Sequence, residues 1–373
     1  MKRSGQLLAL ILTVSVTSLP TVAATVPKVG AACPKVGATQ IVKSTTYTCA
    51  KSGQRNVWRK VSKTNKKNEA AAPSAKPSLS GDPREATYSH IRSIAASRQS
   101  LKPQVEVTYI VNPVLKTAKV QEVKDRFAKA VRFFSQELNG KKFIVVMSNT
   151  ENMEWARVEL QRLSPQPNEW RNYAELFTSN PQNRCRLWGA GNLGTSGGGE
   201  FLQSYIFPPD DCPNENSLPV VWKTSVEHEI VGSVQEIWAS GQPFLLPCWL
   251  VEGQQVYYGS ALGTSMNFTE FSETFAWHRR FKRDDLMTGA KKLGNVQGLD
   301  CGQAGGYEVG RLLVEQLLYE FGHEALVTFT KSIPTINGMD PDKWSIAFST
   351  IFKVSFDEWL IKVVPIIEER ERS

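Results

Sequence analysis

The chain has 373 residues, of which 41% are hydrophobic and 21% are charged, so it is long enough to bury one large core or two smaller ones. Its formal net charge of +8 is unevenly distributed. Residues 25–80 hold eleven lysines and arginines against the single acid Glu69, whereas residues 81–373 hold 31 basic and 35 acidic residues. The basic character therefore belongs to an N-terminal appendage, and a uniformly basic protein is excluded.

The first 24 residues have the layout of a secretory signal peptide. Lys2 and Arg3 precede the apolar run LLALILTVSV, and small residues follow it up to residue 24. The apolar run is short for a membrane span, so an uncleaved membrane anchor is the less favoured alternative. We expect an exported protein that is secreted or associated with the cell wall.

Two segments separate this signal from the main domain. Residues 25–62 contain short β-prone runs punctuated by glycines and two cysteines, which predicts a small disulfide-closed β module. Residues 63–84 are rich in Lys, Ala, Pro and Ser without periodic apolar residues, which is typical of a flexible basic linker. The charge of residues 25–80 suits anionic cell-envelope polymers or lipid headgroups, although a solvated linker has the same composition. No nucleic-acid-binding motif is recognisable, so we expect no nucleic acid partner.

The six cysteines form an even set, which favours disulfides in an exported chain. Cys33 and Cys49 both fall in the small module. Pairing by proximity in the sequence then joins Cys185 to Cys212 and Cys248 to Cys301. A thiolate zinc site is the competing interpretation, but no CxxC pair supports it.

Residues 85–373 alternate between helical and strand patterns and then become mainly helical after residue 259, which predicts an α+β domain. The glycine-rich stretch 185–207 leads into the aromatic run FLQSYIF instead of a helix, which excludes a phosphate-binding loop. We expect a flexible loop and an edge strand beside a cleft there. The earlier elements are expected as helices at 88–96, 120–138 and 152–163 and strands at 105–111 and 142–147.

Residues 224–259 predict a helix, a short loop and a second helix. His228 and Glu229 would lie on the first helix and Glu252 on the second, with Pro247 at its start. Zinc peptidases with the HEXXH motif use two histidines four residues apart, which face one metal from the same side of a helix. They use the glutamate after the first histidine as the general base.

The ordered set HE, WLVEG and YEVG, followed by a closing helical segment, resembles the gluzincin (peptidase MA-like) superfamily of metallopeptidases over most of residues 105–365. The nearest pattern is that of aminopeptidase N and thermolysin-like enzymes, which implies a thermolysin-like catalytic domain. The resemblance assigns His228 and Glu252 as zinc ligands, Glu229 as general base and Tyr307 as the oxyanion donor. Glu252 lies 24 positions beyond His228, one more than in the aminopeptidase branch. A core histidine, a surface carboxylate and a packed tyrosine are the corresponding non-functional interpretations.

The chain departs from this pattern at Gly232, which stands where the second histidine belongs, and at Val309, where the aminopeptidase branch has a lysine. A catalytic zinc normally has three protein ligands, so two would bind it weakly and activate its water poorly. Cys248 is one turn before Glu252 but is expected to be oxidised. None of the other histidines has the sequence spacing from His228 that zinc ligands on one helix have. These histidines are His90, His278 and His323.

Three functions follow from these observations. The first is an exported pseudoenzyme with a degenerate zinc site that binds peptide or cell-wall ligands. The second is an active zinc metallopeptidase with an atypical ligand set. The third is a wall-associated structural protein whose basic module carries the function. The sequence contains no serine or cysteine nucleophile motif that would indicate a hydrolase working without a metal. If the rest of the site is intact, Gly232→His should raise the affinity for zinc.

Overall fold

The computed structural model separates the chain into two compact units, residues 1–72 and 73–373. The signal segment 1–24, the part of the linker before residue 79 and the Cys185–Cys212 pairing lie outside the residues that the structure describes. Those described residues are 31–33, 39–42, 45–52, 55–60, 79–163, 189–196, 198–209, 223–263, 267–278, 285–296, 301, 305–337 and 340–372.

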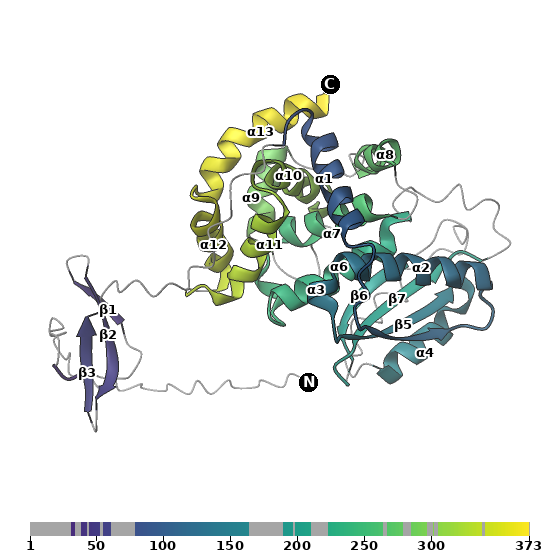
Figure 1. The fold of residues 1–373 in the computed structure, drawn as a ribbon, viewed down its shortest axis with the longest axis horizontal. Helices are drawn as coiled ribbons and strands as arrows, with labels where there is room; N and C mark the ends of the chain where they lie inside the picture. The colour runs from purple at the N-terminus through teal and green to yellow at the C-terminus, as the bar shows by residue number, and fades with distance from the viewer. Residues whose placement is uncertain are drawn as a thin grey trace, which may run out of the picture. The chain divides into compact units, whose positions relative to one another are not determined.

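The small unit is a three-stranded antiparallel sheet in the order β1-β2-β3 (Figure 1). Its strands span Thr39–Val42, Thr45–Ser52 and Arg55–Lys60. The predicted Cys33–Cys49 disulfide is confirmed, and it joins β2 to the segment before β1. Trp58 is buried on β3 directly opposite Cys49, so the disulfide and this aromatic ring share one face of the sheet.

The large unit begins with helix α1, Pro83–Ser97. Asp82 caps its N-terminus by accepting a hydrogen bond from the Glu85 amide at 3.0 Å, and Pro83 occupies the first turn, where its missing N–H costs nothing. The helix therefore starts five residues before the predicted position at residue 88 and includes the end of the predicted linker.

A mixed four-stranded sheet follows, in the order β4-β5-β7-β6. β4 (Glu106–Val111), β5 (Lys142–Asn149) and β7 (Phe201–Phe207) are parallel, whereas β6 (Gly189–Thr195) runs antiparallel to β7 at the edge. The strands at 105–111 and 142–147 were thus predicted correctly within two residues at each end. The strand predicted for the aromatic run is present as β7, and the stretch 185–207 does contain an edge strand. That edge strand is β6, which forms from glycine-rich residues expected as a loop, whereas β7 is an interior strand.

Helices cover both faces of this sheet (Figure 1). Phe143, Val145 and Met147 of β5 pack into the main core with helix α2, Thr117–Phe133. Val146 points to the opposite face, where it packs with Leu160 of α4, Met153–Leu163. This alternation is the period of two expected for a strand that is buried on both sides.

The helix predicted at 120–138 is divided into α2 and the short α3, Ser135–Leu138. Phe134 leaves the helical conformation with φ −97° and ψ 32°. Adjacent side chains on a continuous helix point about 100° apart. The break at Phe134 allows it and Phe133 both to be fully buried, so tertiary packing overrides the helical periodicity here.

The C-terminal half is mainly helical, and α7 lies at its centre (Figure 1). Nearly every residue of α7, Cys248–Leu262, is buried. The other helices of this half are α6 (Ser225–Trp238), α8 (Phe268–His278), α9 (Leu286–Gly294), α10 (Gly306–Phe321), α11 (His323–Ser332), α12 (Lys343–Phe352) and α13 (Phe356–Arg372).

Glycines allow α7 and α10 to cross at very short range. A β-carbon at Gly310 would overlap the carbonyl oxygen of Trp249, and one at Gly253 would overlap the backbone of Gly310. A third glycine, Gly259, lies against the backbone of α6, where an added β-carbon would meet the His228 amide nitrogen at 3.2 Å. The backbones of α6, α7 and α10 are therefore held together directly, which fixes the positions of the side chains between them.

His323 is the first residue of α11 and is a core histidine. The Tyr258 hydroxyl lies 2.7 Å from its Nδ1 atom, and burial lowers the pKa of His323 to about 3 from an ordinary value of 6.5. At pH values between about 3 and 6.5, the His323 imidazole is protonated in the unfolded chain and neutral in the folded chain. The stabilisation that this residue contributes is therefore fully present above pH 6.5 and is lost as the pH falls.

We expect protonation of His323 in the unfolded chain to lower the free energy of unfolding by about 2 kcal/mol between pH 7.5 and pH 5. Urea unfolding of the full chain and of His323→Gln at both pH values measures this contribution. The stability difference between the two proteins should shrink by that amount at pH 5. Equal differences at the two pH values would show that this imidazole titrates alike in both states.

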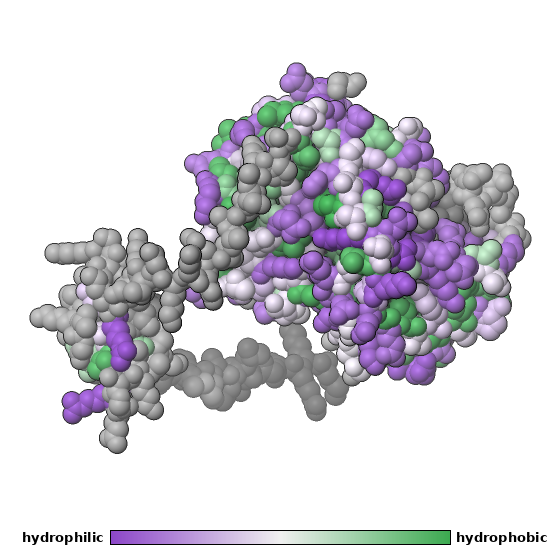
Figure 2. All heavy atoms as spheres, in the orientation of Figure 1, coloured by the Kyte–Doolittle hydropathy of each residue, from purple (hydrophilic) through white to green (hydrophobic). Residues whose placement is uncertain are grey.

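The surface carries mixed polarity. Figure 2 shows hydrophilic residues over most of the visible face of the large unit, with apolar residues in small groups between them. No helix among the described residues has both the length and the apolar character needed to cross a membrane.

Candidate functional site

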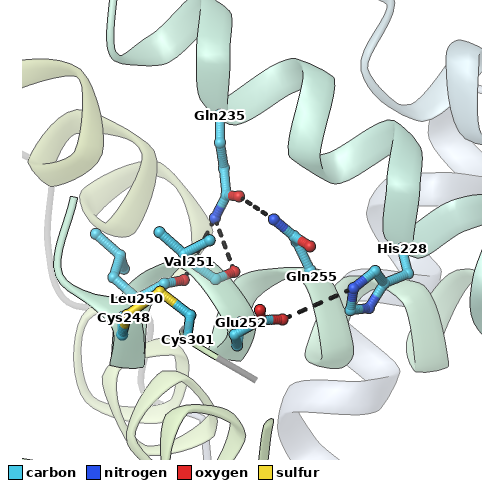
Figure 3. Close-up of a disulfide and its surroundings, with 8 residues drawn as sticks. All are labelled: His228, Gln235, Cys248, Leu250, Val251, Glu252, Gln255 and Cys301. Atoms are coloured by element: carbon cyan, nitrogen blue, oxygen red, sulfur yellow. Dashed lines mark hydrogen bonds and ion pairs between the residues drawn. A yellow bond between two sulfur atoms is a disulfide. The ribbon is translucent and has the colours of Figure 1, made fainter. Parts of the chain in front are cut away.

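The helix, loop and helix predicted for residues 224–259 are present as α6 and α7. Pro247 precedes α7 in an extended conformation with ψ 147°, which ends the loop and starts the helix. His228 projects from α6 and Glu252 from α7, and their side chains point toward each other (Figure 3). The Nε2 atom of His228 lies 3.8 Å from the Oε2 atom of Glu252. Two residues 24 positions apart thus meet at the crossing of the two helices.

Glu229 is buried beside this pair. Its Oε2 atom accepts a hydrogen bond of 2.6 Å from the backbone N–H of Asn192, which lies on the edge strand β6. This bond holds the carboxyl group toward the sheet and occupies one of its two oxygens. The residue predicted as a general base is therefore in the site, and the strand fixes its orientation.

Tyr307 lies at the N-terminal end of α10 and is the most exposed of the predicted site residues, at 36%. Its ring centroid is 5.9 Å from that of His228. The nearby Glu252 carboxylate, then burial, and then Glu229 raise the pKa of Tyr307 well above its usual value of 10, so the phenol keeps its proton. All four residues assigned from the resemblance are thus brought to one place.

Burial sets the protonation of this group. It lowers the pKa of His228 to about 4, and it raises the pKa of Glu229 to about 7. Burial and then the charge of Glu229 raise the pKa of Glu252 to about 8. At neutral pH His228 is therefore a neutral imidazole and Glu252 is mainly protonated. The 3.8 Å separation is too long for a hydrogen bond and is not a charged pair under these conditions.

The pair supplies only part of a zinc site. A tetrahedral zinc holds a histidine nitrogen and a carboxylate oxygen about 3.4 Å apart, close to the separation seen here. Among the described residues, however, no group of three His, Cys, Asp or Glu side chains could hold a metal ion. Cys248 is bonded to Cys301, as predicted, and Tyr258 partners His323. The residues present fit two zinc ligands and do not fit the three that a catalytic zinc requires.

The space opposite Gly232 is filled by side chains from two other elements. A β-carbon at Gly232 would lie 3.0 Å from Nδ2 of Asn192 and 3.4 Å from Nε2 of Gln255. Asn192 is held there by two hydrogen bonds to α6, because its backbone N–H donates to Glu229 and its Oδ1 accepts from the Ser233 hydroxyl at 3.2 Å. Gln255 in turn donates to Oε1 of Gln235 at 2.8 Å (Figure 3).

Asn192 and Gln255 are the site residues that the sequence did not indicate. Gln255 follows Glu252 by three positions on α7, so helical spacing could have placed it on a neighbouring face. Asn192 offered no such signal, since it reaches the site through a strand-to-helix contact across many residues. Gly232 therefore leaves no empty space where the second histidine would stand, because the glycine permits a close approach of β6 to α6.

The Cys248–Cys301 disulfide fixes the remaining side of the site (Figure 3). It ties the first residue of α7 to the segment before α10. Cys301 also accepts a hydrogen bond of 2.9 Å from the Gly306 amide, and a β-carbon at Gly306 would lie 2.8 Å from Cγ of Glu252. The start of α10, with Tyr307, is therefore placed directly against the Glu252 side chain.

No family model, no curated protein and no solved structure matches this chain. The site combines a neutral imidazole, two buried carboxyl groups and a phenol, with two side-chain amides where a second imidazole would stand.

Proposed function

We propose that this chain is an exported protein of the gluzincin metallopeptidase type, with a thermolysin-like large domain, that has lost its catalytic zinc and binds peptide or cell-wall ligands. The meeting of His228 and Glu252 between consecutive helices supports the ancestry. The amide of Asn192 against Gly232 supports the loss of catalysis, because it stands where the third zinc ligand would be. This contact is the observation that carries the proposal.

Strand β6 supports binding of an extended peptide. It is one of the two edge strands of the sheet among the described residues, and its Asn192 is hydrogen-bonded to the site. Extended peptides commonly bind by adding a strand to such an edge, with main-chain hydrogen bonds giving affinity. In this proposal β6 holds the backbone of the ligand and the residues of α6, α7 and α10 contact one of its groups.

A defined mixture of synthetic peptides, incubated with the zinc-equilibrated full chain, tests this function. We expect peptides to be retained on the protein and no cleavage products to appear by mass spectrometry. Cleavage that disappears in Glu229→Gln would contradict the proposal and favour the second candidate, an active zinc peptidase with an atypical ligand set. The near-tetrahedral separation of His228 and Glu252 is the observation in favour of that candidate.

The cellular context belongs to the same proposal. Residues 1–24 would direct export, and the basic residues 25–80 would hold the protein to anionic cell-envelope polymers. Co-sedimentation of the full chain with wall material, lost when salt is raised, checks the second part. Retention that is unaffected by salt would argue against an electrostatic attachment.

A further inference from the structure

One oxygen of the buried Glu252 carboxyl group, Oε2, has no hydrogen-bond partner in the part of the chain that the structure describes. The residue is 9% exposed. Nε2 of His228 lies 3.8 Å from this oxygen, which is beyond hydrogen-bond distance. Because leaving a buried carboxyl group unpaired is costly, this oxygen indicates a ligand atom that binds there.

The same place holds a second carboxyl group, and no lysine or arginine among the described residues stands as its counter-cation. Glu229 is close enough to Glu252 for its charge to act on it. Within the described part of the chain, no lysine or arginine pairs with either glutamate, and the Asn192 amide is the recorded partner of Glu229. Buried carboxyl groups that are ionised are normally paired with cations or metals. Among the described residues, the component that would complete an ionised form of this site is a positive charge with hydrogen-bond donors.

The chemistry of the surrounding atoms selects among cations. A metal needs a third protein ligand, and the amide nitrogen of Asn192 beside Gly232 is a donor that cannot coordinate it. A primary ammonium group has three donors and no acceptor, which matches Oε2 of Glu252, the remaining oxygen of Glu229 and the neutral imidazole of His228. The partly exposed Tyr307 gives the site an aromatic wall, which also favours an organic cation.

We propose that the cation bound at the His228–Glu252 site is a primary ammonium group of the ligand, in the place where related enzymes would hold a metal. The ammonium donates to Glu252 and Glu229, and Tyr307 contacts it from the exposed side. This inference rests on the proposed function, since it names the ligand group that the inactive site recognises. The group can come from the N-terminus of a peptide or from a lysine-type side chain.

Three small probes separate these sources in NMR titrations of the full isotope-labelled chain. Glycylglycinamide offers an α-ammonium, Nα-acetyl-lysine N-methylamide offers a side-chain ammonium, and Nα-acetyl-norleucine N-methylamide offers neither. We expect one or both ammonium probes to shift the His228 resonances and the third probe to leave them unchanged. Glu252→Gln, which keeps the shape of the side chain, should weaken binding at least about tenfold. Glu369→Gln on the exposed face of α13 serves as the matched control and should bind as the unaltered chain does.

Each other outcome overturns the inference. Equal binding of the uncharged probe, no binding of either ammonium probe, or unchanged affinity in a folded Glu252→Gln would each do so. If that variant does not fold, Glu229→Gln repeats the comparison with the other carboxyl group. Failure here without peptide cleavage leaves the proposed binding function in place, whereas zinc-dependent cleavage removes both.

Discussion

The double substitution Gly232→His with Asn192→Ala should convert the site into a zinc site. A histidine at position 232 lies four residues after His228, so both imidazoles would face the same side of α6 together with Glu252. Its β-carbon would otherwise lie 3.0 Å from the Asn192 amide, which the second substitution removes. With three protein ligands in place of two, we expect the affinity for zinc to rise roughly a hundredfold.

Single variants provide the controls, with zinc affinity measured by competition against a chelator. Gly232→His alone should gain little, because the Asn192 side chain is anchored to Ser233 and obstructs the new imidazole. Asn192→Ala alone should gain nothing, since it adds no ligand. A double variant that folds but binds zinc no more tightly than the unaltered chain would refute the derivation of this site from a zinc centre.

Arg126→Met should destabilise the large unit by about 3–5 kcal/mol. Arg126 of α2 is 2% exposed, and its Nη2 atom lies 2.7 Å from Oε2 of Glu227, which is completely buried on α6. Glu227 directly precedes His228, so this pair also locates the helix that carries the site. Removing the guanidinium leaves a buried carboxylate without its charge partner, and urea unfolding measures the loss.

Two comparisons separate the buried charge from simple packing. Arg126→Met combined with Glu227→Leu removes both charges and should recover most of the lost stability, since an apolar replacement of a buried pair is often neutral. Arg157→Met on α4 breaks an exposed pair with Glu154 and should change stability by less than about 1 kcal/mol. A loss in Arg126→Met as small as in Arg157→Met would mean that the pair contributes little.

The helices that carry the site could be predicted because their signals are local. The apolar spacing of α6, the proline before α7 and the position of Glu252 on the following helix all lie within one stretch of 36 residues, 224–259. The pairings of Cys33 with Cys49 and Cys248 with Cys301 followed from the same closeness in sequence. Local pattern was therefore sufficient to bring His228 and Glu252 together.

The other half of the site depends on long-range contacts that no spacing reveals. Asn192 belongs to a glycine-rich strand whose composition favours a loop, and its pairing with β7 overrides that preference. Gly232 shows the same difference between local and long-range information. In the sequence of α6 it stands where the second histidine would be, whereas in the structure it is the point where β6 comes close to α6. Tertiary packing likewise divided the predicted helix at Phe134.

Zinc content decides the central claim most directly. The measurement equilibrates the full-length chain with excess zinc, passes it through a desalting column and weighs it by native mass spectrometry. We expect the chain to carry much less than one zinc ion per molecule. The two fitting ligands, His228 and Glu252, would not retain the metal through that step. One tightly held zinc ion per chain would contradict the account, because a third ligand would then have to exist.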